Sequence, residues 1–500
     1  MTLTGIHKTR ILFLATATAV CVYFVTRALI LGYAGYTPVE KFTGLLLLFC
    51  EGFILIHAVG YARHAMMSGK LGEKTFPVFD QNSELPPVAI VTAARHEPRA
   101  VLERTLNTIN AIDYPNKTVY LLDDSSEPAF MREADELGRE FNVTVYRRDL
   151  RHGAKAGIIN DALAAMTEKY LVIFDADQNP MPDFLKKILP IIESDPKIAF
   201  VQTPQIYTNT LDNPIAEAAA MQQAIFYESI CEGKSMDNAM FCCGTNVIFR
   251  ISALRAVGSF DEKSITEDFA TSIKLHMAGN RSVYYNHAIA FGMAPESLPA
   301  YFKQQSRWAT GTVGVLRTIM EKFAESPGKL TPAQWWEYFL ASSYYLIGWV
   351  YFYLMLAPVL FLIFDIPSFF LSPAIYIATF LPYFLLSSLV FYSSVSDRGY
   401  TVRQIYSGMI ANFLCFPVLM RATFLGLIGK RAPFTITPKN GRETLSFKMM
   451  LPYIVMLALN LAALAMAPYK ISANPTAIAI NSFWVMYHIW LLSHIFALNK

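Results

Sequence analysis

The chain has 500 residues, of which 54% are hydrophobic and 16% charged, and its mean hydropathy is +0.33. This composition is too apolar for an ordinary soluble protein of this size, so we expect an integral membrane protein with a sizeable soluble part. The net charge of +3 gives no indication of nucleic-acid binding. The six cysteines lie in apolar stretches or in the part expected to be cytosolic, so we expect reduced thiols.

Two apolar stretches open the chain, at 11–32 and 42–61 within residues 1–62. Each is long enough to span a bilayer, and no small-residue cleavage site follows the first, so we predict two transmembrane helices rather than a signal peptide. Glu51 lies in the middle of the second stretch. Because a carboxylate inside a membrane is costly, we expect it to face a polar partner or path rather than lipid.

Residues 63–328 have the composition of a soluble α/β domain. Strand-like runs alternate there with segments of helical spacing near 99–111, 127–140 and 155–168. This alternation predicts a mostly parallel sheet, whose ligands gather at the carboxyl ends of the strands. The predicted strands are 88–91, 119–122, 143–146, 171–174 and 198–202.

Residues 329–500 return to a membrane-like composition. A further apolar segment, 402–428, lies in a basic stretch, and counting it as a span would break the positive-inside rule. We therefore expect an interfacial amphipathic helix bent at Pro417, four transmembrane helices after the domain, and a cytosolic domain with both termini cytosolic. The four predicted spans are 338–364, 366–396, 449–469 and 471–499.

The predicted strand 171–174 ends in Asp175-Ala176-Asp177. Two residues apart on an extended chain, Asp175 and Asp177 point the same way, so both carboxylates can face one ligand. Such carboxylates are good oxygen ligands for Mg²⁺ or Mn²⁺ that bridges phosphates. Taken alone, the motif is also compatible with a solvated acidic turn.

Four further stretches support the functional interpretation by their order and spacing. Lys155 stands at a glycine-containing helix start, where it can contact a phosphate. Residues 243–245, Cys-Gly-Thr, precede a predicted strand. Residues 266–268, Thr-Glu-Asp, open a predicted helix, where the acids are alternatively ordinary first-turn residues. Residues 304–308 lie at the approach to the membrane.

In this order the motifs resemble those of the membrane-embedded processive β-glycosyltransferases of family 2, and within them the bacterial cellulose synthase catalytic subunits. The resemblance covers about residues 40–470. It implies a GT-A glycosyltransferase domain inserted between transmembrane helices, a UDP-sugar donor and a divalent cation. The matching pattern is Asp123-Asp124, Asp175-x-Asp177, Thr266-Glu267-Asp268 and Gln304-x-x-Arg307-Trp308.

The resemblance also implies a role for each of these residues. Asp268 would be the general base, within the catalytic motif that includes Thr266 and Glu267, and Asp177 would bind the metal together with Asp175. Trp308 would be the platform on which the acceptor sugar stacks. The acceptor site would also include Cys243, Gly244 and Thr245. The donor would be held by Glu97, Asp123, Asp124, Lys155, Asp175, Gln304 and Arg307.

A segment before the fifth predicted span, 433–439, reads locally as a proline-bounded linker. Its Phe434, Thr437 and Lys439 resemble the gating loop of cellulose synthases, which implies that they close over the bound donor. The sequence departs from the family at 92–97, where Glu97 is retained but a stacking tyrosine is not. We also expect no room for a PilZ domain, and hence activity that is independent of cyclic di-GMP.

The chemistry of the motifs agrees with this resemblance. A hydroxyl that attacks a sugar carbon needs a carboxylate to take its proton, and the leaving diphosphate needs positive charge. The resemblance implies polymerisation of glucose from UDP-glucose into a β-glucan, with 1,4, 1,3 or mixed linkage, and export of the product. The expected partners are the UDP-sugar, the growing polysaccharide, the lipid bilayer and accessory secretion subunits, with no nucleic acid. Alternatives are a synthase using UDP-GlcNAc or GDP-mannose, a non-processive glycolipid transferase, and a transporter with a degenerate domain.

Overall fold

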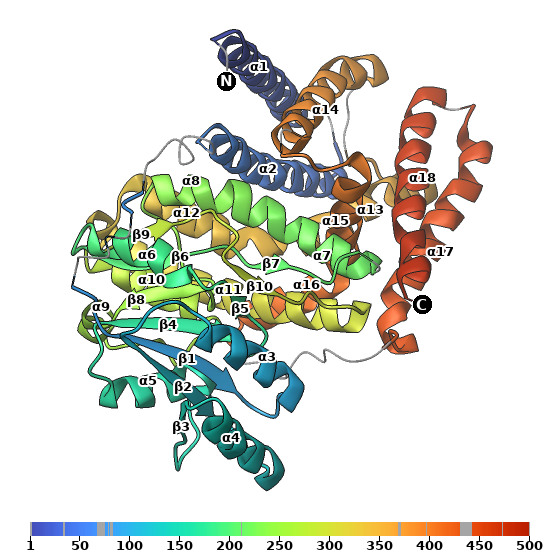
Figure 1. The fold of residues 1–500 in the computed structure, drawn as a ribbon. Coiled ribbons are helices and arrows are strands. Elements are labelled where there is room, and N and C mark those ends of the chain that lie inside the picture. Colours follow the sequence, from blue (N-terminus) through green and yellow to red (C-terminus); the bar gives the residue numbers. More distant parts are fainter. Residues whose placement is uncertain are drawn as a thin grey trace.

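The computed structural model describes most of the chain. The described residues are 3–33, 36–67, 76–78, 80, 84–211, 213–368, 372–396, 398–430, 443–472 and 474–499. They form an α/β domain on one side and a set of long helices on the other (Figure 1). An α/β domain between two groups of long helices is the arrangement that the sequence predicts.

A seven-stranded sheet lies at the centre of the domain, in the order β3-β2-β1-β4-β8-β6-β9. All five predicted strands are confirmed, as β1, β2, β3, β4 and β6. The sheet is mixed, because β8 runs antiparallel to both of its neighbours, β4 and β6. The strands are β1 Val88–Ala94, β2 Lys117–Asp123, β3 Thr144–Tyr146, β4 Tyr170–Asp175, β6 Ile198–Gln202, β8 Val247–Arg250 and β9 Arg281–Tyr284.

Alternate residues of each central strand enter two different cores. In β1, Val88 and Ile90 pack with α3, α4 and α6, while Ala89 and Val91 pack with α5 and α9 on the other face. This is the two-residue period of a strand that is buried on both faces. The three predicted helices are confirmed as α3 to α5. These helices are α3 Arg99–Asn110, α4 Pro128–Glu140, α5 Ala154–Ala165, α6 Phe184–Glu193, α9 Ile251–Ala256 and α10 Glu267–Met277.

The remaining elements of the domain connect the sheet to the long helices. A small second sheet joins β5 Asn179–Pro180, β10 Ala290–Gly292 and β7 Ile206–Tyr207. Between β7 and β8 lie α7, a π-helix and α8, and after β10 comes α11, which is the longest helix of the domain. Their bounds are α7 Pro214–Ile225, the π-helix Phe226–Cys231, α8 Glu232–Met236 and α11 Leu298–Glu325.

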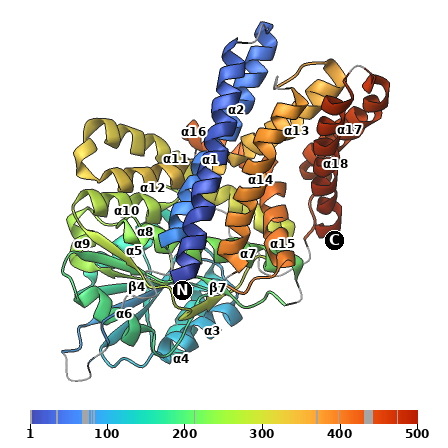
Figure 2. The same ribbon diagram turned by 90° about the horizontal axis from the view of Figure 1, so that it is seen from above.

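Among the described residues, six helical segments are long and apolar enough to cross a membrane, two before the domain and four after it. The chain is therefore a multi-pass membrane protein. Figure 2 shows α1 and α14 side by side, and α17 and α18 paired away from the sheet. α12 and α13 together form one of these segments. The helices are α1 Leu3–Tyr33, α2 Pro38–Met67, α12 Pro332–Ser343, α13 Ile347–Phe364, α14 Pro373–Ser396, α17 Phe447–Lys470 and α18 Pro475–Leu498. Short 3₁₀ turns, Pro327–Lys329 and Tyr344–Leu346, precede and follow α12.

The segment predicted as one bent helix over 402–428 forms two helices, α15 Val402–Leu414 and α16 Phe416–Leu427, at 52° to each other. The break falls at Cys415, and Pro417 sits in the first turn of α16, where its missing N–H costs no hydrogen bond. α15 packs along α7 and α16 along α11, so both lie against helices of the domain. The predicted interfacial position of this segment stays a prediction.

Glu51 has the polar partners that its sequence position predicts. Its carboxylate accepts a hydrogen bond of 2.6 Å from the Tyr23 hydroxyl and pairs with Arg27 at 3.2 Å. Both partners come from α1, so this cluster joins the first two membrane helices. A second buried cluster joins the membrane helices to the domain, because Glu337 of α12 binds Lys234 of α8 at 2.7 Å.

Candidate active site

Buried polar side chains form hydrogen bonds to the acidic turn after β4, the turn that contains Asp175 and Asp177. The Asp175 N–H donates to the Thr245 hydroxyl at 2.8 Å, and the Asn246 amide donates to Gln178 at 2.9 Å. Thr245 and Asn246 are completely buried. They begin the approach to β8, which pairs with β4, so strand pairing brings residues 243–246 to the acidic turn. Thr245 therefore positions Asp175, since its side chain has no accessible surface with which to contact an acceptor.

Gln202, at the end of β6, is a positioning residue that the sequence analysis missed. Its side chain accepts from the Cys243 N–H at 2.8 Å and donates to the Thr245 carbonyl at 2.8 Å. It is completely buried, so these bonds satisfy its amide without water. A glutamine at the carboxyl end of an otherwise apolar strand was the available sequence signal.

Lys155 contacts two of the predicted motifs, the acidic turn and residues 243–245, and lies near a third, residues 266–268. Its ammonium donates to the Gly244 carbonyl at 2.7 Å and pairs with the Asp175 carboxylate. Burial lowers the pKa of Lys155, but the charges of Asp175, Glu267 and Asp268 outweigh it, so the net shift is upward. Lys155 therefore stays protonated and holds positive charge beside the acidic turn.

Asp268 lies in the first turn of α10 and faces residues 243–245. Gly244, at φ +83°, leaves room for it, because a Cβ at that position would lie 2.9 Å from Oδ2 of Asp268. The other oxygen accepts from the Phe269 N–H at 2.8 Å. Neither Asp268 nor Glu267 forms an ion pair with a residue that the structure describes. Burial and the nearby charge of Glu267 raise the pKa of Asp268 to about 7, so it can exchange a proton near neutral pH.

Ser272 of α10 is a second positioning residue missed from sequence. Its hydroxyl donates to the Asp268 carbonyl at 2.7 Å and accepts from the Cys242 N–H at 2.8 Å. It is completely buried and thus ties the start of α10 to residues 242–245. Among them, Cys243 is partly accessible, and burial raises the pKa of its thiol well above the ordinary value, so it is not an activated nucleophile.

The start of α10 packs directly on the backbone of α11. A Cβ on Gly311 would lie 2.5 Å from Cγ2 of Thr266, so only glycine allows this approach. Arg307 and Trp308 lie about one turn earlier in α11, and both are partly accessible. Arg307 is close enough for its charge to lower the pKa of both Glu267 and Asp268. The helix contact therefore brings the motifs 266–268 and 304–308 into one site.

Tyr207 of β7 is a further residue near the site that the sequence did not reveal. Burial raises the pKa of its hydroxyl, and the charges of Asp177 and Arg307 act on it, so it lies near both the acidic turn and α11. Its two-residue strand has no distinctive sequence pattern.

Asp123 and Asp124, at the end of β2, are already bonded to arginines. Asp123 accepts from Arg147 at 2.6 Å, and Asp124 accepts from Arg148 at 2.9 Å and from Arg151 at 3.2 Å. Both aspartates are buried. The sequence analysis predicted this acidic pair as a donor contact but missed the three arginines that neutralise it.

Of the remaining predicted donor residues, Glu97 lies in the loop after β1 and the other three lie outside the described residues. The Glu97 carboxylate accepts from the Arg95 N–H, in the loop after β1. Phe434, Thr437 and Lys439 of the predicted gating loop are not among the described residues, so that prediction stays a prediction.

The carboxylates present fit a divalent cation bound mainly through a diphosphate. Asp175 and Asp177 offer two carboxylates at the strand end, and no cluster of three or more metal-ligating side chains occurs in the described ranges. Proteins usually bind Mg²⁺ through one or two carboxylates, and phosphate oxygens of the substrate supply further ligands.

Comparison with known proteins agrees with this geometry. Residues 86–311 match the family model described as "Glycosyltransferase like family 2". The match spans the central sheet and the motifs of the candidate site.

The full chain is similar to bacterial cellulose synthase catalytic subunits. It is 28% identical over 481 residues to the UDP-forming cellulose synthase catalytic subunit of Pseudomonas fluorescens. This alignment covers 91% of this chain and 62% of the relative. It is 27% identical over 473 residues to cellulose synthase 2 of Novacetimonas hansenii, covering 90% of this chain and 28% of the relative. The chain thus spans less than two thirds of the length of both relatives.

Among solved structures, a mannosyltransferase from Pyrobaculum calidifontis in complex with GDP-Man and Mn²⁺ is similar. The identity is 18% and the TM-score 0.49, with 77% of this chain and all of that chain covered.

Proposed function

We propose that this protein is a processive, inverting glycosyltransferase that polymerises glucose from UDP-glucose into a β-glucan and passes the product across the membrane. The observation that carries the proposal is that motifs far apart in the sequence are in contact. Lys155 links the acidic turn to residues 243–245, and the start of α10 packs on α11 beside Arg307 and Trp308. These contacts support a single site in which Asp268 is the proton acceptor and Trp308 the indole platform.

In the proposed reaction, Asp268 takes the proton of the acceptor hydroxyl as that oxygen attacks the anomeric carbon of the donor. One displacement inverts the α-linked donor and yields a β-linkage. Arg307 and Lys155 stabilise the negative charge of the departing diphosphate. A divalent cation, held by Asp177 and Asp175, would neutralise part of that charge when bound.

Trp308 supplies the face on which the terminal sugar of the product stacks, because sugars expose apolar C–H groups. α11, which carries Trp308, leads through α12 into the span that ends in α13. This continuity supports export through the adjacent helices. We also propose that the domain and both termini are cytosolic, which reporter fusions at the termini can test.

The decisive experiment supplies radiolabelled UDP-glucose to the purified, reconstituted protein and analyses product length and linkage. A long β-glucan supports the proposal, and the linkage analysis separates 1,4 from 1,3 bonds. A short lipid-linked saccharide as the only product would instead identify a glycolipid transferase. Incorporation from UDP-GlcNAc or GDP-mannose, with none from UDP-glucose, would identify a different donor.

A further inference from the structure

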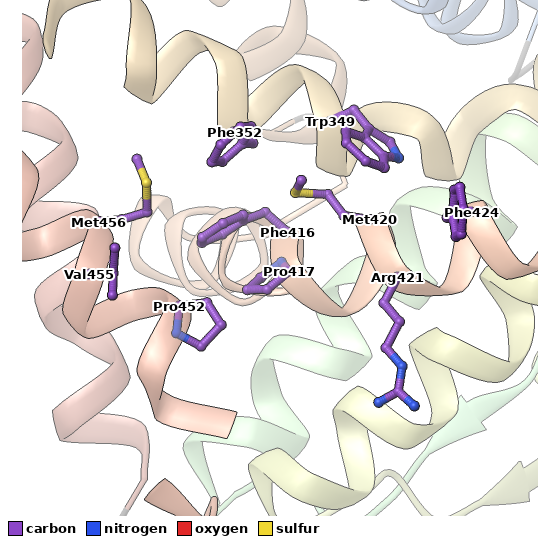
Figure 3. Close-up of a pocket in the computed structure, with 10 residues that line it drawn as sticks. All are labelled: Trp349, Phe352, Phe416, Pro417, Met420, Arg421, Phe424, Pro452, Val455 and Met456. Atoms are coloured by element: carbon purple, nitrogen blue, oxygen red, sulfur yellow. The ribbon is translucent and has the colours of Figure 1, made fainter. Parts of the chain in front are cut away.

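A groove of about 430 Å³ opens between α13, α16 and α17, on helices separate from the catalytic motifs (Figure 3). Nine of its ten lining residues are apolar, and Arg421 is the tenth. Several wall residues face outward from the protein. Trp349 of α13 is 43% exposed, Phe424 of α16 54%, and Val455 of α17 46%.

The wall chemistry excludes a sugar chain as the natural occupant. Sugars need hydrogen-bond partners for their hydroxyl groups, and a site that binds them places a few polar groups among its apolar ones. Here Phe352, Met420 and the exposed wall residues offer hardly any polar surface. α13 and α17 each belong to a predicted membrane span, so the groove opens where hydrocarbon chains surround the protein.

Arg421 makes one end of the groove charged, whereas the other lining residues are apolar. Figure 3 shows its guanidinium at one end, pointing away from the apolar side chains. It forms no ion pair or hydrogen bond with any residue in the described part of the chain. α16 packs along α11 of the domain, so apolar side chains lie toward the membrane helices and the charge lies on the other side.

We propose that this groove binds an anionic phospholipid, with an acyl chain along the apolar walls and the phosphate at Arg421. Charge complementarity favours an anionic headgroup, because residues 397–448 contain eight basic and two acidic residues. The lipid fills space between the spans and an interfacial helix that packs on the domain. This site is independent of the proposed catalytic activity.

The test is photo-crosslinking of the full-length protein in phosphatidylcholine vesicles that contain a trace of phosphatidylglycerol with a photoreactive acyl chain. We expect labelled peptides from α13, α16 and α17 above the background on α1, whose exposed apolar side chains are not among the residues that line this groove. Arg421→Gln should reduce the groove labelling about fivefold, the effect of one basic residue at a membrane surface. The matched control is Arg403→Gln, an exposed arginine of α15 outside the groove, which should label as wild type.

A second variant keeps the test valid if Arg421→Gln does not fold. Val455→Trp fills the groove and should abolish its labelling, whereas Leu451→Trp, exposed on α17 outside the lining, should not. Photoreactive phosphatidylcholine should label the groove less than phosphatidylglycerol. Groove labelling at the α1 background, or labelling that neither Arg421→Gln nor Val455→Trp reduces, would overturn the proposal. Equal labelling by both lipids would overturn the anionic preference.

Discussion

Two acidic pairs that look alike in the sequence have opposite surroundings in the structure. Asp123 and Asp124 follow β2 and are bonded to three arginines. Glu267 and Asp268 begin α10, form no ion pair with a described residue, and the pKa of Asp268 is raised to about 7. The first pair is thus bonded to cations, while Asp268 can take up a proton near neutral pH. The contrast shows that neighbouring charges and burial, rather than residue type, distinguish an ion-paired carboxylate from one whose pKa is raised.

The largest expected effect is that of Asp268→Asn. It removes the proposed proton acceptor with little change in volume, so turnover should fall about a thousandfold while UDP binding persists. Turnover of labelled donor and calorimetric UDP titration measure the two effects. Near wild-type turnover in the variant would contradict the role of Asp268.

The same variant should not lower stability above pH 7. Because the pKa of Asp268 is raised on folding, its ionised form opposes folding, and that cost grows as pH rises from the unfolded pKa through about 7. Asparagine removes the cost. The melting temperature at pH 8 should therefore equal or exceed that of wild type, and a large decrease would show that the carboxylate is structural.

The contact between α10 and α11 tests how Asp268 is placed. Gly311→Ala puts a methyl group 2.5 Å from Thr266 and should displace the start of α10, with about a hundredfold loss of turnover. Gly314→Ala is the matched control, since its nearest neighbour atom, the Gly426 carbonyl oxygen, would be 3.8 Å away. Equal turnover in the two variants would show that this helix contact does not position the site.

The pH dependence of kcat/KM should report the raised pKa directly. Asp268 acts as a base only when ionised, so the rate should fall about tenfold per pH unit below about pH 7. Glu267→Gln removes a negative charge that raises this pKa and should shift the profile to lower pH, whatever its effect on the maximum rate. A profile that stays flat down to pH 5 would exclude Asp268 as the titrating group.

The smallest expected effect on turnover belongs to the arginine-bonded pair. Asp124→Asn breaks the buried ion pairs with Arg148 and Arg151 and leaves Arg148 with only its longer pair to Asp161, which should cost about 3 kcal/mol of stability. Turnover below the melting temperature should fall far less than in Asp268→Asn, with the change mainly in KM for the donor. Thermal unfolding and kinetics on one preparation measure both, and a full loss of turnover with unchanged stability would reverse the comparison.

The sequence predicted the local elements well because their signals are local. Apolar runs and turns marked β1 to β4, and an isolated carboxylate in an apolar run, Glu51, required partners that the structure supplies as Tyr23 and Arg27. The bend predicted at Pro417 within 402–428 lies at Cys415, two residues before the proline, where α15 ends and α16 begins. The packing of these two helices on α7 and α11 is a tertiary feature that periodicity alone does not report.

Sequence alone predicted which residues would carry the chemistry. The motifs at 123–124, 175–177, 266–268 and 304–308 are short, and their residue types state what each can do. Tertiary structure decided which of them act together and in which protonation state. Gln202 and Ser272 join residues 242–245 to other elements through buried hydrogen bonds, although they lie 41 and 30 residues away from their partners in sequence. Such bonds, and the pKa shifts that accompany them, arise only when distant segments exclude water from one another.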